Sequence, residues 1–173
     1  MSAFESQTIL LVEDNEDDVF IFNRVVKKAG ITNPLQVLDD GEDAILYLSG
    51  QGRFADRNAF PLPCLVLLDL KLPRTDGLDV LKWIRTQSHL DGVFVVVLTS
   101  SAEERDIVRA YQLGARSYLV KPPNPDSLFA ILDTLPLAWG AKTERKKIVG
   151  EKLPVKDFGA SSHARNVPQG SDD

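Results

Sequence analysis

The sequence predicts an α/β fold built on a parallel β-sheet, and two observations carry this prediction. Along residues 1–140, five short runs rich in Val, Ile and Leu alternate with segments whose apolar residues recur at helical spacing. Strands that alternate with helices form a parallel sheet that helices cover on both faces, with right-handed crossovers. The 173 residues are enough for one domain of ordinary size. We therefore expect one domain over residues 1–140.

Each apolar run has the length and the composition of a buried strand. Both faces of a parallel sheet are covered, so its strands are apolar throughout and do not alternate with polar residues. The longest run has six residues. A membrane-spanning helix needs about 20, so we expect no membrane segment. The predicted strands are residues 8–12, 35–38, 64–68, 93–98 and 117–120.

The predicted helices follow the apolar spacing between these strands. The first has one face at i, i+3, i+7 and i+10 and a glycine after its end, formed by Val19, Phe22, Val26, Ala29 and Gly30. We expect Phe20 to join the core beside Phe22. Residues 101–104 are typical of a capping box, and Asn124 before Pro125 is typical of a helix start. The other predicted helix faces are residues 43–49, 78–85, 107–114 and 128–135.

Two segments do not fit the alternation. Residues 50–63 contain two Gly, two Pro and two Phe. They are longer than the connection of about 2–6 residues that is usual between such elements. This loop is either a surface insertion without a function or a feature that distinguishes a subgroup of related proteins. Residues 141–173 show charge, Gly, Ser and Pro but no sustained period, so we expect a flexible C-terminal tail.

The charge distribution and the cysteine count exclude several classes of protein. Residues 1–140 hold 13 Lys/Arg against 20 Asp/Glu, whereas residues 141–173 hold 7 against 5. Binding to nucleic acid needs clustered basic residues, so the acidic body argues against it. One cysteine cannot form an internal disulfide, and the N-terminus does not resemble a signal peptide. We therefore expect a cytoplasmic protein.

Polar residues follow four of the predicted strands directly. Glu13 and Asp14 follow the first strand, Asp69 the third, Thr99 the fourth and Lys121 the fifth. Ligands of open α/β sheets bind beyond the carboxyl ends of the strands. If these strands are neighbours, three carboxylates, a hydroxyl and an ammonium group meet at one edge of the sheet.

This set of groups predicts chemistry on a phosphoryl group. Three carboxylates and one lysine leave a net charge of −2, which repels itself unless a cation enters. Hard oxygen ligands with room for water suit Mg²⁺. The cation would attract a phosphoryl group, which a carboxylate could accept as an acyl phosphate. Lys121 and Thr99 could bind the other phosphoryl oxygens.

Four motifs surround these strand ends, at residues 10–15 (LLVEDN), 67–73 (LLDLKLP), 98–101 (LTSS) and 118–122 (YLVKP). They resemble the motifs of the receiver (response regulator) domain of two-component signalling, and the resemblance covers residues 7–138. It implies a flavodoxin-like sandwich of three layers, in which five helices surround a five-stranded sheet of order 2-1-3-4-5. It also implies a signalling protein that assists its own phosphorylation and dephosphorylation, rather than an enzyme.

The resemblance implies an acceptor and a metal site. Asp69 resembles the phosphoacceptor of the family. Glu13 and Asp14 resemble the metal-binding carboxylates, and together with Asp69 and the backbone carbonyl of Lys71 they would hold Mg²⁺.

The resemblance also implies a switch. Thr99 and Lys121 resemble the residues that bind the phosphoryl group, and the peptide between Lys121 and Pro122 is expected to be cis. Thr99 and Tyr118 resemble the pair whose movement carries the signal to the face formed by the fourth helix, fifth strand and fifth helix. That face is expected to bind a partner protein or a second copy of the chain.

The family implies partners that donate the phosphoryl group. These are the phosphohistidine of a sensor histidine kinase or of a histidine phosphotransfer protein. The loop at residues 50–63 and the acidic run at residues 16–18 resemble features of a subgroup of the family. This subgroup consists of stand-alone regulators paired with phytochrome-type kinases. We expect no nucleic-acid partner, no membrane partner and no output domain after residue 140.

Three alternatives compete with this interpretation. A phosphatase of the haloacid dehalogenase type needs a second Asp two positions after the nucleophile, but Lys71 stands there. A nucleotide-binding domain would need a glycine-rich phosphate loop, and the sequence has neither common form. A receiver that binds partners without phosphorylation is disfavoured by the complete set of site residues.

Overall fold

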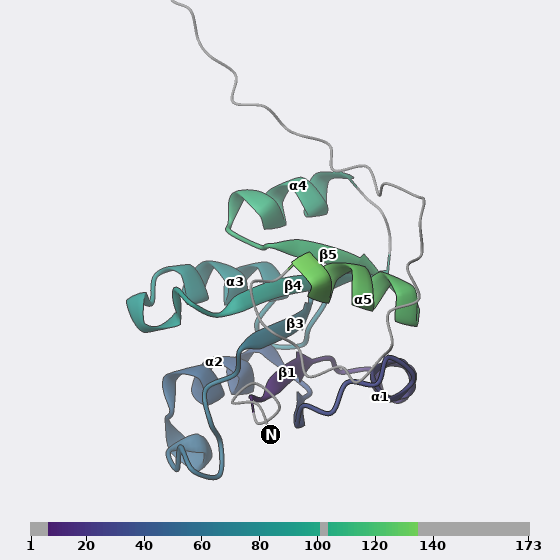
Figure 1. The fold of residues 1–173 in the computed structure, drawn as a ribbon. Helices are drawn as coiled ribbons and strands as arrows, with labels where there is room; N and C mark the ends of the chain where they lie inside the picture. The colour runs from purple at the N-terminus through teal and green to yellow at the C-terminus, as the bar shows by residue number, and fades with distance from the viewer. Residues whose placement is uncertain (1–6, 101–103, 135–173) are drawn as a thin grey trace, which may run out of the picture. The chain divides into compact units, whose positions relative to one another are not determined.

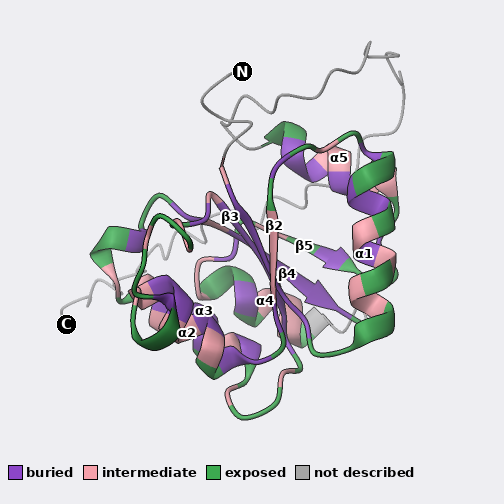
Figure 2. Ribbon diagram, turned by 90° about the horizontal axis from the view of Figure 1, so that it is seen from below, coloured by how far each residue is buried: buried purple, intermediate pink, exposed green. Residues whose placement is uncertain are grey.

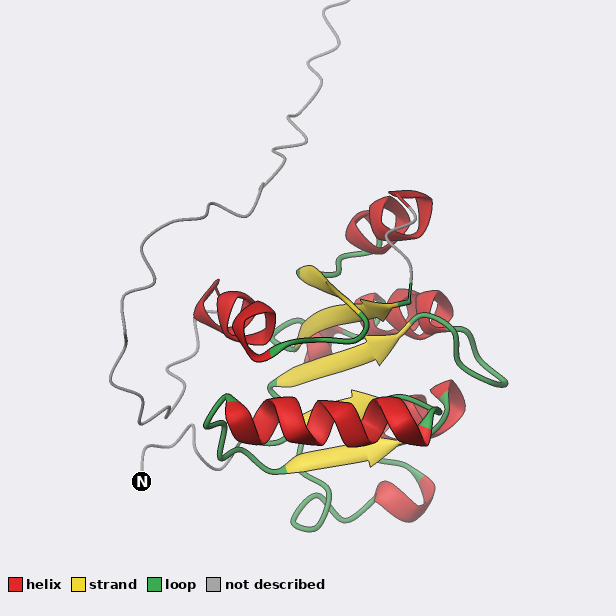
Figure 3. Ribbon diagram, turned by 90° about the vertical axis from the view of Figure 1, so that its right-hand side faces the viewer, coloured by secondary structure: helices red, strands yellow, loops and turns green. Residues whose placement is uncertain are grey.

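The computed structural model describes residues 7–100 and 104–134. Its strands are β1 (Ile9–Val12), β2 (Leu35–Leu38), β3 (Leu65–Asp69), β4 (Phe94–Thr99) and β5 (Ser117–Val120). All pair in parallel, in the order β2-β1-β3-β4-β5, as expected. The strand arrows accordingly run the same way in Figure 3. The prediction of the fold class is therefore confirmed.

Five α-helices surround this sheet (Figure 1). α1 and α5 cover one face, and α2, α3 and α4 cover the other (Figure 2). Two short 3₁₀ helices, η1 (Gly52–Phe54) and η2 (Ser88–Leu90), follow α2 and α3. The helices are α1 (Glu16–Lys28), α2 (Gly41–Ser49), α3 (Gly77–Arg85), α4 (Glu104–Gln112) and α5 (Pro125–Thr134).

The core lies in two layers because successive strand residues point to opposite faces of the sheet. Leu10 and Leu68 pack on the side of α2 and α3. Leu11 and Leu67 pack on the side of α1 and α5. All four side chains are fully buried or nearly so, and each contributes roughly 1.5–3 kcal/mol relative to exposure. The two layers hold the central strands rigidly and so fix the positions of their carboxyl ends.

Some helix ends differ from the sequence prediction. α2 begins at Gly41 rather than at residue 43, because Asp40 caps it by accepting a hydrogen bond from the Asp43 N–H at 2.8 Å. Asn124 caps α5 as predicted, accepting from the Ser127 N–H at 2.8 Å. The first three residues of the predicted capping box and residues 135–173, which include the predicted tail, lie outside the described residues.

The prediction that Phe20 joins the core beside Phe22 is wrong. Its side chain is 62% exposed, whereas Phe22 is fully buried. Residue 20 lies about 200° around the helix from residue 22, so it cannot share the buried face. No helix in the described part of the chain is long and apolar enough to cross a membrane.

The long connection between α2 and β3 packs against the body of the domain. The rings of Tyr47, Phe54 and Phe60 contact one another, with centroids 5.2–6.1 Å apart. Arg57 donates hydrogen bonds to the carbonyls of Tyr47 and Leu48, at 2.8 and 2.9 Å. These two carbonyls lie at the end of α2, where a helix lacks its own donors. The aromatic contacts and the arginine therefore fix this connection to α2.

Candidate functional site

The carboxyl ends of four strands bring the predicted site residues to one edge of the sheet. Asp69 is the last residue of β3 and Thr99 the last residue of β4. Glu13 follows β1 and Lys121 follows β5. Because β1, β3, β4 and β5 are successive neighbours, these residues gather in a row. Glu13, Asp69 and Thr99 are at most 5% exposed.

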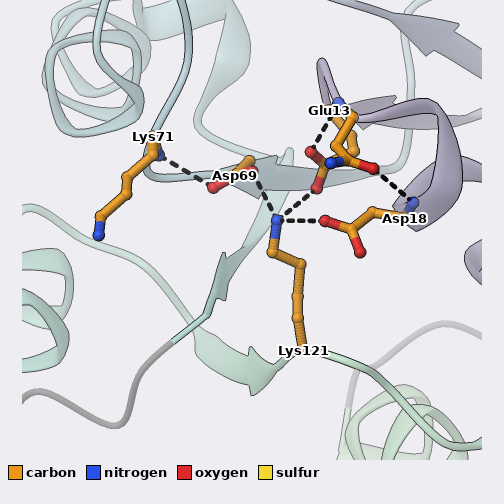
Figure 4. A network of polar contacts seen from close by, with 6 residues as sticks. Glu13, Asp18, Asp69, Lys71 and Lys121 are labelled. Atoms are coloured by element: carbon orange, nitrogen blue, oxygen red, sulfur yellow. Dashed lines mark hydrogen bonds and ion pairs between the residues drawn. The ribbon is translucent and has the colours of Figure 1, made fainter.

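Lys121 lies at the centre of this group (Figure 4). Its ammonium donates hydrogen bonds to Glu13 Oε2 at 2.8 Å, Asp69 Oδ2 at 2.8 Å and Asp18 Oδ2 at 2.9 Å. An ammonium group has three N–H donors, and each can serve one of these carboxylates. The lysine therefore holds together the ends of β1 and β3 and the first turn of α1.

Three of the carboxylates are close enough to share a cation. Oxygens of Glu13, Asp14 and Asp69 lie within 4.8 Å of one another, and Asp14 is exposed on the solvent side. The donor set is all oxygen and strongly negative, and it therefore fits Mg²⁺. The Lys71 N–H donates to Asp69 Oδ1 at 2.9 Å, and the Lys71 side chain extends away from the carboxylates (Figure 4).

The pKa values of Glu13 and Lys121 are both raised, for different reasons. Desolvation raises the pKa of Glu13 to about 7, against the opposing hydrogen bond from Lys121. Burial alone would lower the pKa of Lys121, but hydrogen bonds to Asp69, Glu13 and Asp18 outweigh it and raise the pKa above its usual value. Lys121 is therefore charged throughout the neutral range, whereas the charge on Glu13 is costly.

Substituting Glu13 by glutamine should flatten the pH dependence of stability in the metal-free protein. The pKa of Glu13 rises from 4.5 to about 7 on folding, so the folded state binds more protons than the unfolded chain between these values. The free energy of unfolding of the wild type must therefore fall as pH rises through this window. The measurement is the melting temperature in EDTA at several pH values. If the difference between the two proteins does not change from pH 4.5 to 7, the expectation is wrong.

Asp18 is a member of the site that sequence reasoning missed. It lies in the first turn of α1, where its N–H donates to the capping side chain of Asn15 at 3.0 Å. Its carboxylate is 27% exposed and pairs with Lys121. The sequence carried no clear signal for this role, because Asp18 does not follow a strand and its three-residue acidic run is typical of a helix start.

Thr99 and Lys121 are also linked through the backbone. The Lys121 N–H donates to the Thr99 carbonyl at 2.8 Å. The peptide between Lys121 and Pro122 is cis. The two residues therefore stand at the ends of adjacent strands, and Thr99 lies next to the end of β3 that carries Asp69.

Tyr118 lies apart from the carboxylate group, on the β5 edge of the sheet. Its side chain is 36% exposed. Its ring meets the ring of Tyr111 from α4 edge to face, with centroids 6.1 Å apart and an interplanar angle of 89°. In this structure the ring therefore faces outward, beside another exposed tyrosine.

Comparison with known proteins finds a family and several relatives. The sequence model described as “Response regulator receiver domain” matches residues 9–133. The response regulator Rcp1 of Synechocystis sp. is 38% identical over 133 residues, which is 77% of this chain and 88% of that protein.

Solved structures with the same fold include two at 37% identity. The bacteriophytochrome response regulator RtBRR superposes with a TM-score of 0.72, covering 80% of this chain and 83% of the other. The Mn²⁺-bound form of Rcp1 superposes with a TM-score of 0.64, covering 76% and 99%. The matched residues 9–133 contain every member of the carboxylate and lysine group described above.

Proposed function

The chain belongs to the response regulator receiver domain family, whose members act in two-component signalling, and from this we propose that Asp69 accepts a phosphoryl group. The observation that carries the proposal is the setting of Asp69. Its buried carboxylate touches the Lys121 ammonium and lies within 4.8 Å of two further carboxylates that could share a cation with it. A carboxylate held beside a lysine and a bound cation would be suited to attack an anionic phosphoryl donor.

The proposed donor is the phosphohistidine of a sensor histidine kinase or of a phosphotransfer protein. An Asp69 oxygen forms a bond to phosphorus while the phosphorus–nitrogen bond of the donor breaks. The electron pair of that bond stays on the imidazole nitrogen, which takes up a proton, and Asp69 carries an acyl phosphate. The name of RtBRR, a bacteriophytochrome response regulator, supports a phytochrome-type kinase as the partner.

Residues of this chain hold the acceptor and the transferred group. The Lys71 N–H fixes Asp69 Oδ1, and Lys121 fixes Oδ2. When Asp69 is phosphorylated, Lys121 loses a carboxylate acceptor, so its ammonium becomes available to the phosphoryl oxygens. Thr99, buried at the adjacent strand end, would supply a hydroxyl to the same group.

Glu13, Asp14 and Asp69, with the backbone carbonyl of Lys71, would hold Mg²⁺. The compact oxygen cluster supports this assignment, as does the Mn²⁺ bound by the related Rcp1. When bound, the cation would neutralise negative charge on the phosphoryl oxygens.

Labelling with a small phosphoryl donor tests the proposal. Acetyl phosphate with Mg²⁺ should add one phosphoryl group to the full chain, as measured by intact-mass spectrometry. The same incubation in EDTA should leave the mass unchanged. Labelling that is equal with and without the cation, or no labelling under either condition, would contradict the proposed function.

We further propose that phosphorylation is transmitted to the face formed by α4, β5 and α5. Phosphorylation replaces the single negative charge of the Asp69 carboxylate by a phosphoryl group that carries about −1.5 to −2 charges. If Thr99 moves to bond these oxygens, it leaves space that the ring of Tyr118 can occupy. The outward position of Tyr118 beside Tyr111 supports this route, because this face presents two aromatic rings. Such a surface suits binding to a partner or to a second copy.

Tyr118→Ala should weaken the response without preventing phosphorylation. The variant keeps all groups around Asp69, so acetyl phosphate should label it like the wild type. Beryllium fluoride with Mg²⁺, a phosphoryl mimic, should shift the NMR signals of α4 and α5 in the wild type and shift them less in the variant. A full response by the variant would show that the signal does not pass through this ring.

A further inference from the structure

The loop between β3 and α3, residues 70–76, rests against the start of α2. We propose that Arg74 is a positioning residue, which holds this loop in place through an ion pair with Asp40. The inference rests on the proposed function, because the loop begins directly after Asp69 and contains Lys71. It assigns a role to a surface arginine that lies outside the group of site residues.

The backbone of this loop connects directly to the proposed acceptor. The Lys71 N–H donates to the Asp69 side chain at 2.9 Å. At the other end, the Gly77 N–H donates to the Leu70 carbonyl at 3.0 Å and closes the loop. A displacement of the loop would therefore move the donor that orients Asp69 and the carbonyl of Lys71 at the same time.

Arg74 has an unfavourable backbone conformation at the middle of the loop. Among the described residues it is the one non-glycine residue with a positive φ, at 62°. An L-residue other than Gly, Asn or Asp costs roughly 1–2 kcal/mol in this region. The surrounding contacts must therefore hold the loop in this shape.

Both carboxylate oxygens of Asp40, the partner of Arg74, are held by contacts. Asp40 Oδ1 caps α2 by accepting from the Asp43 N–H, and Asp40 Oδ2 pairs with the Arg74 guanidinium. The Asp40 side chain is 6% exposed. A carboxylate that is buried this far is costly without a counter-charge, so the ion pair favours the observed position of the loop.

The arginine also neutralises an acidic cluster at the start of α2. Oxygens of Asp39, Asp40 and Asp43 lie within 4.8 Å of one another. Arg53, from η1 in the long connection after α2, pairs with Asp43, and Arg74 pairs with Asp40. Two separate segments thus supply the positive charges that this cluster requires.

α2 and the loop are in close contact at Gly41, with no room for a side chain between them. A Cβ atom on Gly41 would lie 2.2 Å from the Thr75 carbonyl oxygen and 2.9 Å from Val80 Cγ2. The backbones therefore touch directly beside the ion pair. Loss of the pair would leave the strained Arg74 backbone free to relax away from this contact.

Hydrogen exchange and Mg²⁺ titration of the full chain test the inference. Arg74→Ala and Asp40→Asn, which keeps the capping oxygen, should both speed the exchange of the amides of residues 70–77 in the metal-free protein. Both should weaken Mg²⁺ affinity about three- to tenfold. The double variant should be no weaker than the single ones, because the two residues act through one contact.

Two control variants separate the ion pair from other effects. Glu42→Gln removes a charge that is 3.6 Å from Arg74 and 60% exposed, and it should behave like the wild type. Arg74→Gly removes both the strain and the guanidinium, and it should behave like Arg74→Ala. If it instead behaves like the wild type, backbone conformation alone positions the loop and the proposal is wrong.

The outcome also distinguishes this inference from the proposed function. Wild-type exchange and wild-type Mg²⁺ affinity in Arg74→Ala would overturn the inference alone, provided that the wild type is labelled by acetyl phosphate. Absence of labelling in the wild type would overturn the proposed function instead. The exchange measurement needs neither metal nor phosphoryl group, so it tests the loop contact in either case.

Discussion

Asp69→Asn is expected to abolish phosphorylation completely, whereas wild-type protein gains one phosphoryl group from acetyl phosphate and Mg²⁺. The amide keeps the shape of the side chain but is not a nucleophile under these conditions. Intact-mass spectrometry measures the result directly. No other carboxylate in the described group accepts the Lys71 N–H together with the Lys121 ammonium, so we expect no second acceptor to replace it.

Asp69→Asn should remain folded. A matched control, Asp17→Asn, shows whether loss of a negative charge alone prevents labelling. Asp69→Asn removes one of the four carboxylates of the site, three of which pair with the single lysine, and this relieves repulsion in the metal-free site. Its melting temperature in EDTA should therefore be at least that of the wild type. Asp17→Asn removes an exposed charge from the first turn of α1, and it should be labelled normally. Equal labelling of Asp69→Asn and the wild type would mean that the acceptor is elsewhere.

The sequence could predict the residues at the strand ends because their positions follow from the fold class alone. In a parallel sheet, every residue that directly follows a strand lies at the same edge. Glu13, Asp69, Thr99 and Lys121 are therefore found by marking where each apolar run stops. The order of the strands did not follow from the runs, and it was supplied by the resemblance to the family.

Contacts between side chains of different elements could not be predicted in the same way. Asp18 reaches Lys121 across 103 positions, and Arg74 reaches Asp40 between two different loops. Neither pair belongs to a repeating pattern in the sequence. The outward ring of Tyr118 depends on its packing against Tyr111, which is also a tertiary contact. The sequence therefore predicts where the acceptor lies better than it predicts what holds it in place.

Gly77→Ala is expected to disturb both stability and phosphorylation, because Gly77 touches the backbone of Asp69. A Cβ atom at this position would lie 2.0 Å from the Asp69 carbonyl oxygen and 2.7 Å from the Leu70 Cα. Backbone atoms cannot rotate away as a flexible side chain can. The end of β3 or the start of α3 must therefore move. We expect a loss of about 2–4 kcal/mol in the free energy of unfolding.

The same displacement should reach the chemistry, since Asp69 would move relative to Lys121. Misplacing a reacting group by a fraction of an ångström slows a positioned reaction, so labelling by acetyl phosphate should be at least about tenfold slower. Gly92→Ala is the matched control, because nothing lies within 4 Å of its added Cβ and it should behave like the wild type in both measurements. A Gly77→Ala protein with wild-type stability and wild-type labelling rate would show that the start of α3 does not fix the acceptor. If stability falls but the labelling rate of the folded protein does not, the contact supports the fold without positioning Asp69.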